Sequence, residues 1–305
     1  MTLGTQPWAE PVLEWRAPLD YAALQDRLQR DAELLTTWPV APSETFPTDC
    51  YRLGEHYWIS QRGVGAVQFT ALDPQLSAFP FPDSDTSWFR EVVRRAWLPA
   101  IYPFWGRQVI HASAAGPADT SDVIAFTGPT LAGKSTTAYA MGRRPGWRLV
   151  SDDTLAFTAS SGDGVRLHPL RNDARLRPAS ADYFGKAGHP FEPVEWPSRP
   201  LSLRAVYVLD GADDRPALPH FEKLGVAERL PLLLQQAYAL SFKIPSYNQE
   251  LMTAYAHLAA SVPAYRLRFQ RSFAVAGALF DAIEDHAGAE LKLRTSARAT
   301  RSTSA

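Results

Sequence analysis

Cysteine is nearly absent from this chain: its 305 residues contain one, Cys50. A single cysteine excludes a disulfide within the chain and a zinc site built on cysteines, and it is typical of a reducing compartment. No convincing histidine partner for a nucleophilic thiol is present in the sequence. We therefore interpret Cys50 as a structural residue.

Net charge and long apolar runs are lacking as well. The formal net charge is −1, so no overall field draws the chain to nucleic acid or to a membrane surface. No apolar run approaches the roughly 20 residues that a membrane span requires. The first twenty residues contain Pro7, Glu10, Pro11 and Glu14 in place of the apolar core of a signal peptide. We expect a cytoplasmic protein without nucleic-acid or membrane partners; a homo-oligomer is compatible with the sequence.

What the chain does contain is a phosphate-loop pattern. Residues 123–127 are apolar and β-branched, as in a buried strand, and G-x-x-x-x-G-K-[ST] follows directly at Gly128, Gly133, Lys134 and Ser135. A helical run comes next, so the loop amides and the helix N-terminus would converge on phosphate oxygens. Lys134 would reach the β- and γ-phosphates, and the Ser135 hydroxyl would ligate Mg²⁺. The predicted nucleotide-binding set in this loop is Gly128, Thr130, Ala132, Gly133, Lys134, Ser135 and Thr136.

Two adjacent acids, Asp152 and Asp153, follow the loop after one helix, a Pro145-Gly146 break and a short strand. Side chains that are neighbours at a strand end point to different sides. One carboxylate can then serve Mg²⁺ while the other accepts a proton from an acceptor hydroxyl, the combination that phosphoryl transfer needs. The alternative is an Asp pair that forms a turn or caps a helix.

Three segments together resemble a known family. They are Val-Ile-His111-Ala-Ser, the loop Gly128-Pro-Thr-Leu-Ala-Gly-Lys-Ser-Thr, and Arg148-Leu-Val-Ser-Asp-Asp. This pattern is similar to the HPr kinase/phosphorylase family, and more closely to its shorter relatives: HPr-kinase-like proteins of unassigned substrate and those that phosphorylate peptide natural products. The resemblance covers residues 106–286, with its strong motifs between His111 and Asp153.

The resemblance implies a fold shared with phosphoenolpyruvate carboxykinase, in which a mixed sheet surrounds the loop. It also implies that Lys134 and Ser135 bind ATP–Mg²⁺. From the acid pair itself, Asp152 is the candidate second metal ligand. Asp152 or Asp153 would be the base, and His111 would support the acidic pair. Thr136 stands where the HPr-directed enzymes usually carry Glu, and their Arg-Gly-Leu-Gly segment is missing. Both departures argue against HPr as substrate and against phosphorylase activity.

The expected organisation is α/β, with a P-loop kinase core of this type and a small N-terminal module. We assign residues 1–105 to an α+β module without identifiable chemistry, which could dock the substrate. Residues 106–286 form the kinase domain. Residues 287–305 lack periodicity and are rich in Ser, Thr, Ala and Arg, which predicts a disordered tail.

Periodicity and turn residues predict the individual elements. In the N-terminal part these are a helix over 20–35 capped by Asp20, strands at 56–60, 64–70 and 76–81, and a helix starting near 83. In the C-terminal part they are a hairpin at 155–158 and 165–167, strands at 204–209, 220–224 and 265–269, and helices at 226–240, 249–261 and 273–283. Ser246 and Gln249 match a capping box for the second of these helices.

Three arginines, Arg171, Arg175 and Arg177, follow the acid pair and suit phosphate oxygens. Arg171 is the first candidate for a γ-phosphate contact because it lies closest to the strand end. A solvated face or salt bridges are the alternative for each arginine. The Pro- and Gly-rich stretch 169–200 is interpreted as a lid or acceptor-binding segment, or else as a surface excursion.

These observations together predict an ATP- and Mg²⁺-dependent kinase. The resemblance implies that its acceptor is a serine of a peptide or small protein. Two alternatives stay open: a kinase of a small hydroxylated metabolite or natural product, and a nucleotide-gated binding protein without transfer chemistry. The acid pair argues against the second alternative, because a sensor needs no base.

Overall fold

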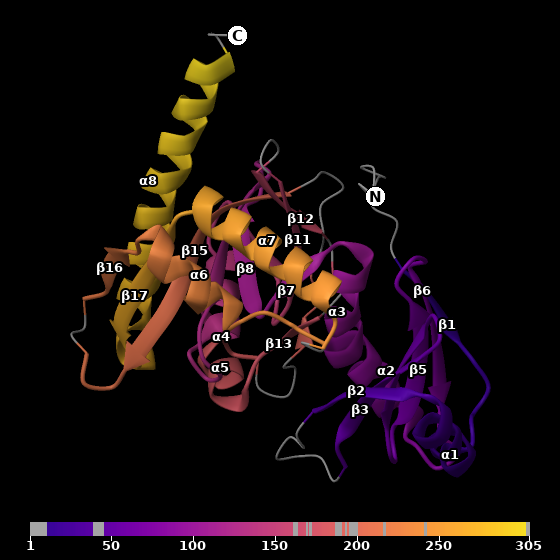
Figure 1. Cartoon of the computed structure of the whole chain (residues 1–305). Coiled ribbons are helices and arrows are strands. Elements are labelled where there is room, and N and C mark those ends of the chain that lie inside the picture. The colour runs from indigo at the N-terminus through magenta and orange to yellow at the C-terminus, as the bar shows by residue number, and fades with distance from the viewer. Residues whose placement is uncertain are drawn as a thin grey trace. The chain divides into compact units, whose positions relative to one another are not determined.

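The computed structural model of the chain describes residues 11–38, 46–160, 164–168, 170, 173–186, 191–192, 194, 201–215, 218–240 and 243–302. Their contacts form two units: Met1–Arg107 with Tyr238–Leu251, and Gln108–Ala237 with Met252–Ala305. The structure is mixed α/β, as the sequence predicted (Figure 1). Tyr238–Leu251, which the sequence assigned to the domain 106–286, groups with the first unit. Within the described residues, no helix is long and apolar enough to cross a membrane.

The first unit is built on a six-stranded sheet in the order β1-β6-β5-β4-β3-β2. Strands β2 to β6 pair with their chain neighbours in antiparallel fashion, and β1 lies parallel to β6. The elements are β1 (Val12–Trp15), α1 (Tyr21–Asp31), β2 (Glu33–Trp38), β3 (Thr48–Leu53), β4 (His56–Gln61), β5 (Gly65–Thr70), β6 (Gln75–Pro80), α2 (Thr86–Val92), a π-helical segment (Val93–Trp97), α3 (Leu98–Ile101) and a 3₁₀ turn (Tyr102–Trp105).

Local capping and packing explain the helices of this unit. The Asp20 carboxylate accepts a hydrogen bond from the backbone N–H of Ala23, so the predicted N-cap of α1 is confirmed. Leu24 and Leu28 of α1 pack into a core with sheet residues such as Trp58. The helix ends at Asp31, four residues before the predicted end, because residues 33–38 pair with β3 as strand β2.

The segment Tyr238–Leu251 is attached to the first unit by polar and aromatic contacts. The Trp38 indole Nε1 donates to the carbonyl oxygen of Leu240 at 3.3 Å, and Lys243 Nζ donates to that of Leu34 at 3.0 Å. The rings of Phe104 and Tyr247 lie 5.1 Å apart. Contacts between residues this far apart in the chain have no local sequence signal.

The second unit contains a nine-stranded mixed sheet in the order β10-β8-β9-β15-β12-β11-β7, with β17 beside β15 and β16 beside β17. Strands β9, β15 and β17 run parallel, so their carboxyl ends lie at one edge. The elements are β7 (Gln108–Ile110), β8 (Ala112–Pro117), β9 (Asp122–Thr127), α4 (Lys134–Gly142), β10 (Trp147–Ser151), β11 (Leu155–Ser160), β12 (Gly164–His168), β13 (Ala174–Arg175), α5 (Pro178–Tyr183), β14 (Phe191–Glu192), β15 (Leu201–Ala212), β16 (His220–Lys223), α6 (Val226–Leu234), α7 (Pro245–Ser261), β17 (Ala264–Gln270), a 3₁₀ turn (Phe273–Val275) and α8 (Ala276–Ser302). The first residues of α7 belong to the first unit.

Helices α4 and α8 bury their apolar residues against this sheet. One core cluster combines Met141 of α4, Phe280 and Ile283 of α8, and Phe126 and Tyr207 of the central strands. The glycine loop between β9 and α4 is therefore anchored at both ends by buried elements.

Three C-terminal predictions need correction. Helix α6 ends at Leu234 rather than at 240, and α7 begins at Pro245, so Ser246 lies inside the helix and the predicted capping box is wrong. The predicted disordered tail is wrong for residues 287–302, because α8 continues to Ser302. Alanine, leucine, glutamate, lysine and arginine in this stretch are strong helix formers, and they extend a helix whose first turns are packed.

Candidate functional site

The predicted phosphate loop joins β9 to α4, with the strand and the helix where the sequence predicted them. Gly128 has a φ of 140°, and a Cβ at this position would lie 3.0 Å from the carbonyl oxygen of Leu209 on β15. Glycine therefore allows the loop to pass closely over the neighbouring strand. Gly133, with a φ of 98°, turns the chain into α4. Backbone N–H groups at such a helix start favour an anion.

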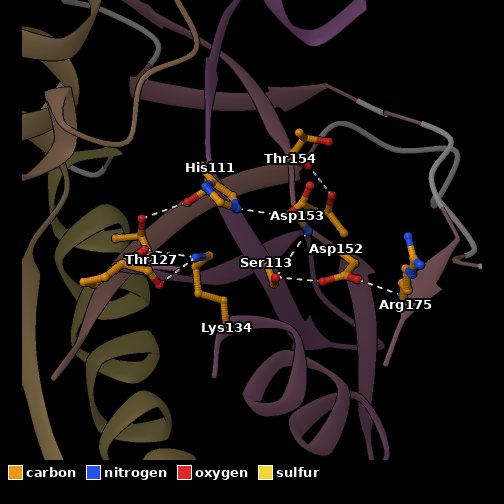
Figure 2. A network of polar contacts seen from close by, with 11 residues as sticks. His111, Ser113, Thr127, Lys134, Asp152, Asp153, Thr154 and Arg175 are labelled. Atoms are coloured by element: carbon orange, nitrogen blue, oxygen red, sulfur yellow. Dashed lines mark hydrogen bonds and ion pairs between the residues drawn. The ribbon is translucent and has the colours of Figure 1, made fainter. Parts of the chain in front are cut away.

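Lys134, the first residue of α4, folds back into its own loop. Its ammonium donates to the carbonyl oxygens of Gly128 at 2.9 Å and Pro129 at 3.1 Å, and only 6% of the residue is exposed (Figure 2). Burial lowers the pKa of Lys134, whereas the carboxylates of Asp153 and Asp152 act in the opposite direction.

Asp152 follows the end of β10 and is buried, with 2% of the residue exposed. Its Oδ1 accepts a hydrogen bond from the Ser113 hydroxyl on β8 at 2.9 Å, and its Oδ2 accepts from the backbone N–H of Arg175 at 2.8 Å (Figure 2). Hydrogen bonds to the ionised form compensate a buried carboxylate for the loss of water. Asp152 is thus held in one position by donors from two different elements.

Asp153 has a different environment from its neighbour. Its side chain is 43% exposed, and its Oδ1 lies 2.8 Å from Nε2 of His111. Its backbone has a φ of 68°, and the backbone N–H donates to the Ser113 hydroxyl at 3.3 Å. In the described part of the chain, the other non-glycine residue with positive φ is Leu131, in the phosphate loop. Backbone conformations of this kind gather at functional sites.

His111 lies at a break between β7 and β8 rather than inside one strand. Its backbone N–H donates to the carbonyl oxygen of Gln236 at 2.7 Å, and its carbonyl oxygen accepts from the Thr127 hydroxyl at 2.9 Å. Thr127 directly precedes the phosphate loop. The main chain of His111 is therefore fixed on both sides, which positions the imidazole against Asp153.

The structure joins His111, Asp152 and Asp153 in one network through Ser113, and Figure 2 shows Lys134 bound to the loop that follows Thr127, a further contact of His111. Of the other predicted residues, Ser135 lies half-buried in the first turn of α4, and the Thr136 hydroxyl is 2.7 Å from that of Ser180 on α5. Thr130 is exposed in the loop, and Ala132 packs against the core. Arg171 lies outside the described residues.

Sequence reasoning missed two members of the network. Ser113 is only two residues beyond His111 in the chain, so its hydroxyl was a candidate that the sequence offered. Arg175 was considered for its guanidinium, but the structure shows a contact of its backbone N–H with Asp152. A backbone contact is independent of side-chain type and leaves no trace in the sequence.

No protein-family model and no curated protein sequence matches this chain. Among solved structures, the HPr(Ser) kinase/phosphatase from Coxiella burnetii is similar at 13% sequence identity and a TM-score of 0.33. That match covers 61% of this chain and 99% of the other. The likeness to an HPr kinase/phosphatase is therefore distant.

Proposed function

We propose that this chain is an ATP- and Mg²⁺-dependent kinase that transfers the γ-phosphoryl group to a hydroxyl. One observation carries the proposal: a glycine loop with a buried lysine begins directly after Thr127, and the Thr127 hydroxyl donates to the carbonyl oxygen of His111, whose ring contacts the carboxylate of Asp153. Phosphoryl transfer depends on a cradle for the phosphates, positive charge beside them and a base for the acceptor. These are the parts that the loop, Lys134 and the acid pair supply.

Asp153 is the better candidate for the base. Both carboxylate oxygens of Asp152 accept hydrogen bonds from protein donors, and that side chain is buried. Asp153 is partly exposed, so an acceptor hydroxyl can approach it. His111, in contact with Asp153 Oδ1, orients the carboxylate and stabilises its charge.

In the proposed step, Asp153 removes the proton of the acceptor hydroxyl while that oxygen forms a bond to the γ-phosphorus. The bond between the γ-phosphorus and the bridging oxygen breaks, and ADP leaves with the electron pair. Lys134 exchanges its loop carbonyl contacts for phosphate oxygens and neutralises part of their charge. The loop amides hold the β-phosphate in place.

The donor set fits magnesium. Mg²⁺ takes oxygen ligands and is usually held by one or two protein groups together with phosphates and water. The Ser135 hydroxyl and the Asp152 carboxylate are oxygen ligands of this kind, and the described residues contain no cluster of three or more His, Cys, Asp or Glu that would form an all-protein site. When bound, Mg²⁺ would neutralise phosphate charge.

We place the acceptor hydroxyl on a serine of a peptide or small protein. This choice is supported only by the motifs that resemble peptide-directed HPr-kinase-like enzymes. The test is mass spectrometry of a peptide pool and a metabolite pool after incubation with the full chain, ATP and Mg²⁺. A mass increase of one phosphate on a peptide serine supports the proposal, whereas labelling confined to the metabolite pool moves the acceptor to a small hydroxylated compound.

Lys134→Met is the matched control for this assay, because it removes the ammonium and keeps the length of the apolar stem. Product formation that persists at the wild-type rate in this variant would show that the activity arises elsewhere. Tight ATP binding without any phosphorylated product would replace the kinase with a nucleotide-gated binding protein.

A further inference from the structure

Two exposed aromatic rings lie against each other in the second unit. Tyr183 on α5 and Phe273 after β17 stack with their ring centroids 4.6 Å apart and an interplanar angle of 21°. The two residues remain 41% and 39% exposed. Of the described residues, only one other aromatic residue, Trp88, is this exposed. A stacked and exposed pair presents an aromatic surface that the mechanism above does not use.

Tyr183 is connected to the phosphate loop through α5. The Ser180 hydroxyl of α5 lies 2.7 Å from the hydroxyl of Thr136, which is two residues beyond Lys134 in the first turn of α4. Tyr183 follows Ser180 by three residues, and residues three apart lie on the same helix face. The ring of Tyr183 is thus about one helical turn from a side chain that contacts the start of α4.

Phe273 is connected to the same edge of the sheet through β17. Strands β9, β15 and β17 are parallel neighbours, so Gln270 at the end of β17 and Thr127 at the end of β9 leave the sheet at its carboxyl edge. Two strand spacings amount to about 10 Å, and because Gln270 pairs with Ala212, four positions beyond Val208, the partner of Thr127, β17 also extends about 13 Å further from this edge. Phe273 follows Gln270 by three residues. Ligands of open α/β sheets bind outside the carboxyl ends of the strands.

We propose that Tyr183 and Phe273 form the platform on which the purine ring of the nucleotide stacks. This inference rests on the proposed function, because it needs a triphosphate in the loop between β9 and α4. A base has an apolar face of the same kind as the two rings, and stacking on aromatic side chains contributes to binding without hydrogen bonds to the base edge. The platform would hold the base while the loop holds the phosphates.

The experiment compares two ligands, MgATP and inorganic tripolyphosphate with Mg²⁺, by titration calorimetry on the full chain. Tyr183→Ala and Phe273→Ala should each weaken ATP binding by about 5- to 150-fold and leave tripolyphosphate binding unchanged. Tyr183→Phe and Phe273→Tyr should restore ATP affinity, because they keep an aromatic ring. Trp88→Ala, at a similarly exposed aromatic residue, should leave both affinities unchanged.

Several outcomes would overturn the platform. Wild-type ATP affinity in both alanine variants would remove the rings from the nucleotide site, and a raised KM for the acceptor alone would assign them to acceptor binding. Equal losses for ATP and tripolyphosphate would show that the substitutions disturb the phosphate loop instead. In each of these cases the kinase proposal stands. A wild-type chain that binds neither ligand would overturn both proposals.

Discussion

The two sheets of this protein bury different kinds of polar group. In the unit of the six-stranded sheet, the buried polar residues of the described part are uncharged, as in Gln25 of α1, which donates to the Ser60 hydroxyl on β4 at 3.1 Å. In the described part of the chain, the buried charged residues are Lys134 and Asp152, and both belong to the unit of the nine-stranded sheet. Buried charge is costly and is a poor route to stability. The first unit is therefore organised for packing, whereas the second retains buried charges that packing alone does not explain.

Among the substitutions that test this contrast, a change at Asp153 is expected to have the largest effect. Asp153→Asn should lower the rate of phosphoryl transfer by about 10²- to 10⁴-fold, because the amide cannot accept the proton. The melting temperature should stay close to that of the wild type, since asparagine tolerates a positive φ. Single-turnover kinetics and thermal unfolding measure the two quantities.

Asp152→Asn is the matched comparison, because it removes an oxygen that accepts a hydrogen bond from Ser113 or Arg175. This neighbouring substitution should lower stability as well as rate. Equal rates for Asp153→Asn and the wild type would refute the assignment of the base.

The next effect concerns the packed core of the first unit. Phe69 is buried on β5, with the rings of Tyr57 and Phe104 at centroid distances of 5.3 and 5.2 Å. Phe69→Ala should lower the free energy of unfolding by about 3–5 kcal/mol through lost burial and a cavity. Denaturant titration measures this, and Leu72→Ala, at a residue that is 91% exposed, should change it by less than about 0.5 kcal/mol. A small effect at Phe69 would contradict the view that this sheet is built for packing.

Alkaline pH should have a smaller effect on the free energy of unfolding. A buried group in the first unit should lower this free energy as pH rises, and one in the second unit should raise it. Burial raises the pKa of the Cys50 thiol from 9.0 to about 12, so above pH 9.0 the unfolded chain loses this proton before the folded chain does. Cys50 should then make stability fall as pH rises, by at most about 1.4 kcal/mol per pH unit. The stability difference between the wild type and Cys50→Ala should shrink between pH 8 and about pH 10.

Lys134 should act in the opposite direction. Its pKa in the folded chain is lowered from 10.5, so over the range just below pH 10.5 the folded chain loses this proton first. Stability from this residue therefore rises with pH in that range, and Lys134→Met should lack the rise. If the free energies of unfolding of Lys134→Met and Cys50→Ala changed with pH in the same way, the predicted contrast between the two buried groups would be contradicted.

The smallest expected effect on stability comes from removing the N-cap of helix α2 in the first unit. Asp85 Oδ1 accepts from the backbone N–H groups of Ser87 and Trp88 at 2.7 and 3.1 Å, which caps α2. Asp85→Ala should cost about 1 kcal/mol of stability. Asp83→Ala, at an exposed acid outside the cap, is the matched control and should have almost no effect in the same denaturant titration. Equal losses at both positions would show that general charge, and not the cap, is responsible.

Local features were the ones that the sequence predicted. The Asp20 cap, the β9–loop–α4 connection and the hairpin of β11 and β12 each depend on residues close together in the chain, where turn chemistry and periodicity act. The position of the acids after β10 is of the same kind. Their nearness to His111 was inferred from the family pattern, and the structure places His111 and Asp153 in contact.

Features that depend on distant pairing were missed. No strand was predicted before residue 20, yet β1 lies parallel to β6, and paired residues of the two strands are more than sixty positions apart in the chain. The different environments of Asp152 and Asp153 come from Ser113, Arg175 and His111, which are contributed by separate elements. The local sequence Asp-Asp does not predict which of the two acids is buried, because tertiary contacts decide this.

The discontinuity of the first unit has a consequence for how the protein is made. Its sheet is complete once Pro80 at the end of β6 has left the ribosome, but Leu240, Lys243 and Tyr247 attach to that unit from far downstream. At typical translation rates, synthesis of the roughly 160 intervening residues takes on the order of 10 s. During that interval the first unit lacks the segment Tyr238–Leu251, while β9 and the loop after it are being synthesised. A protein cut after Arg107 would stay permanently in that unfinished condition.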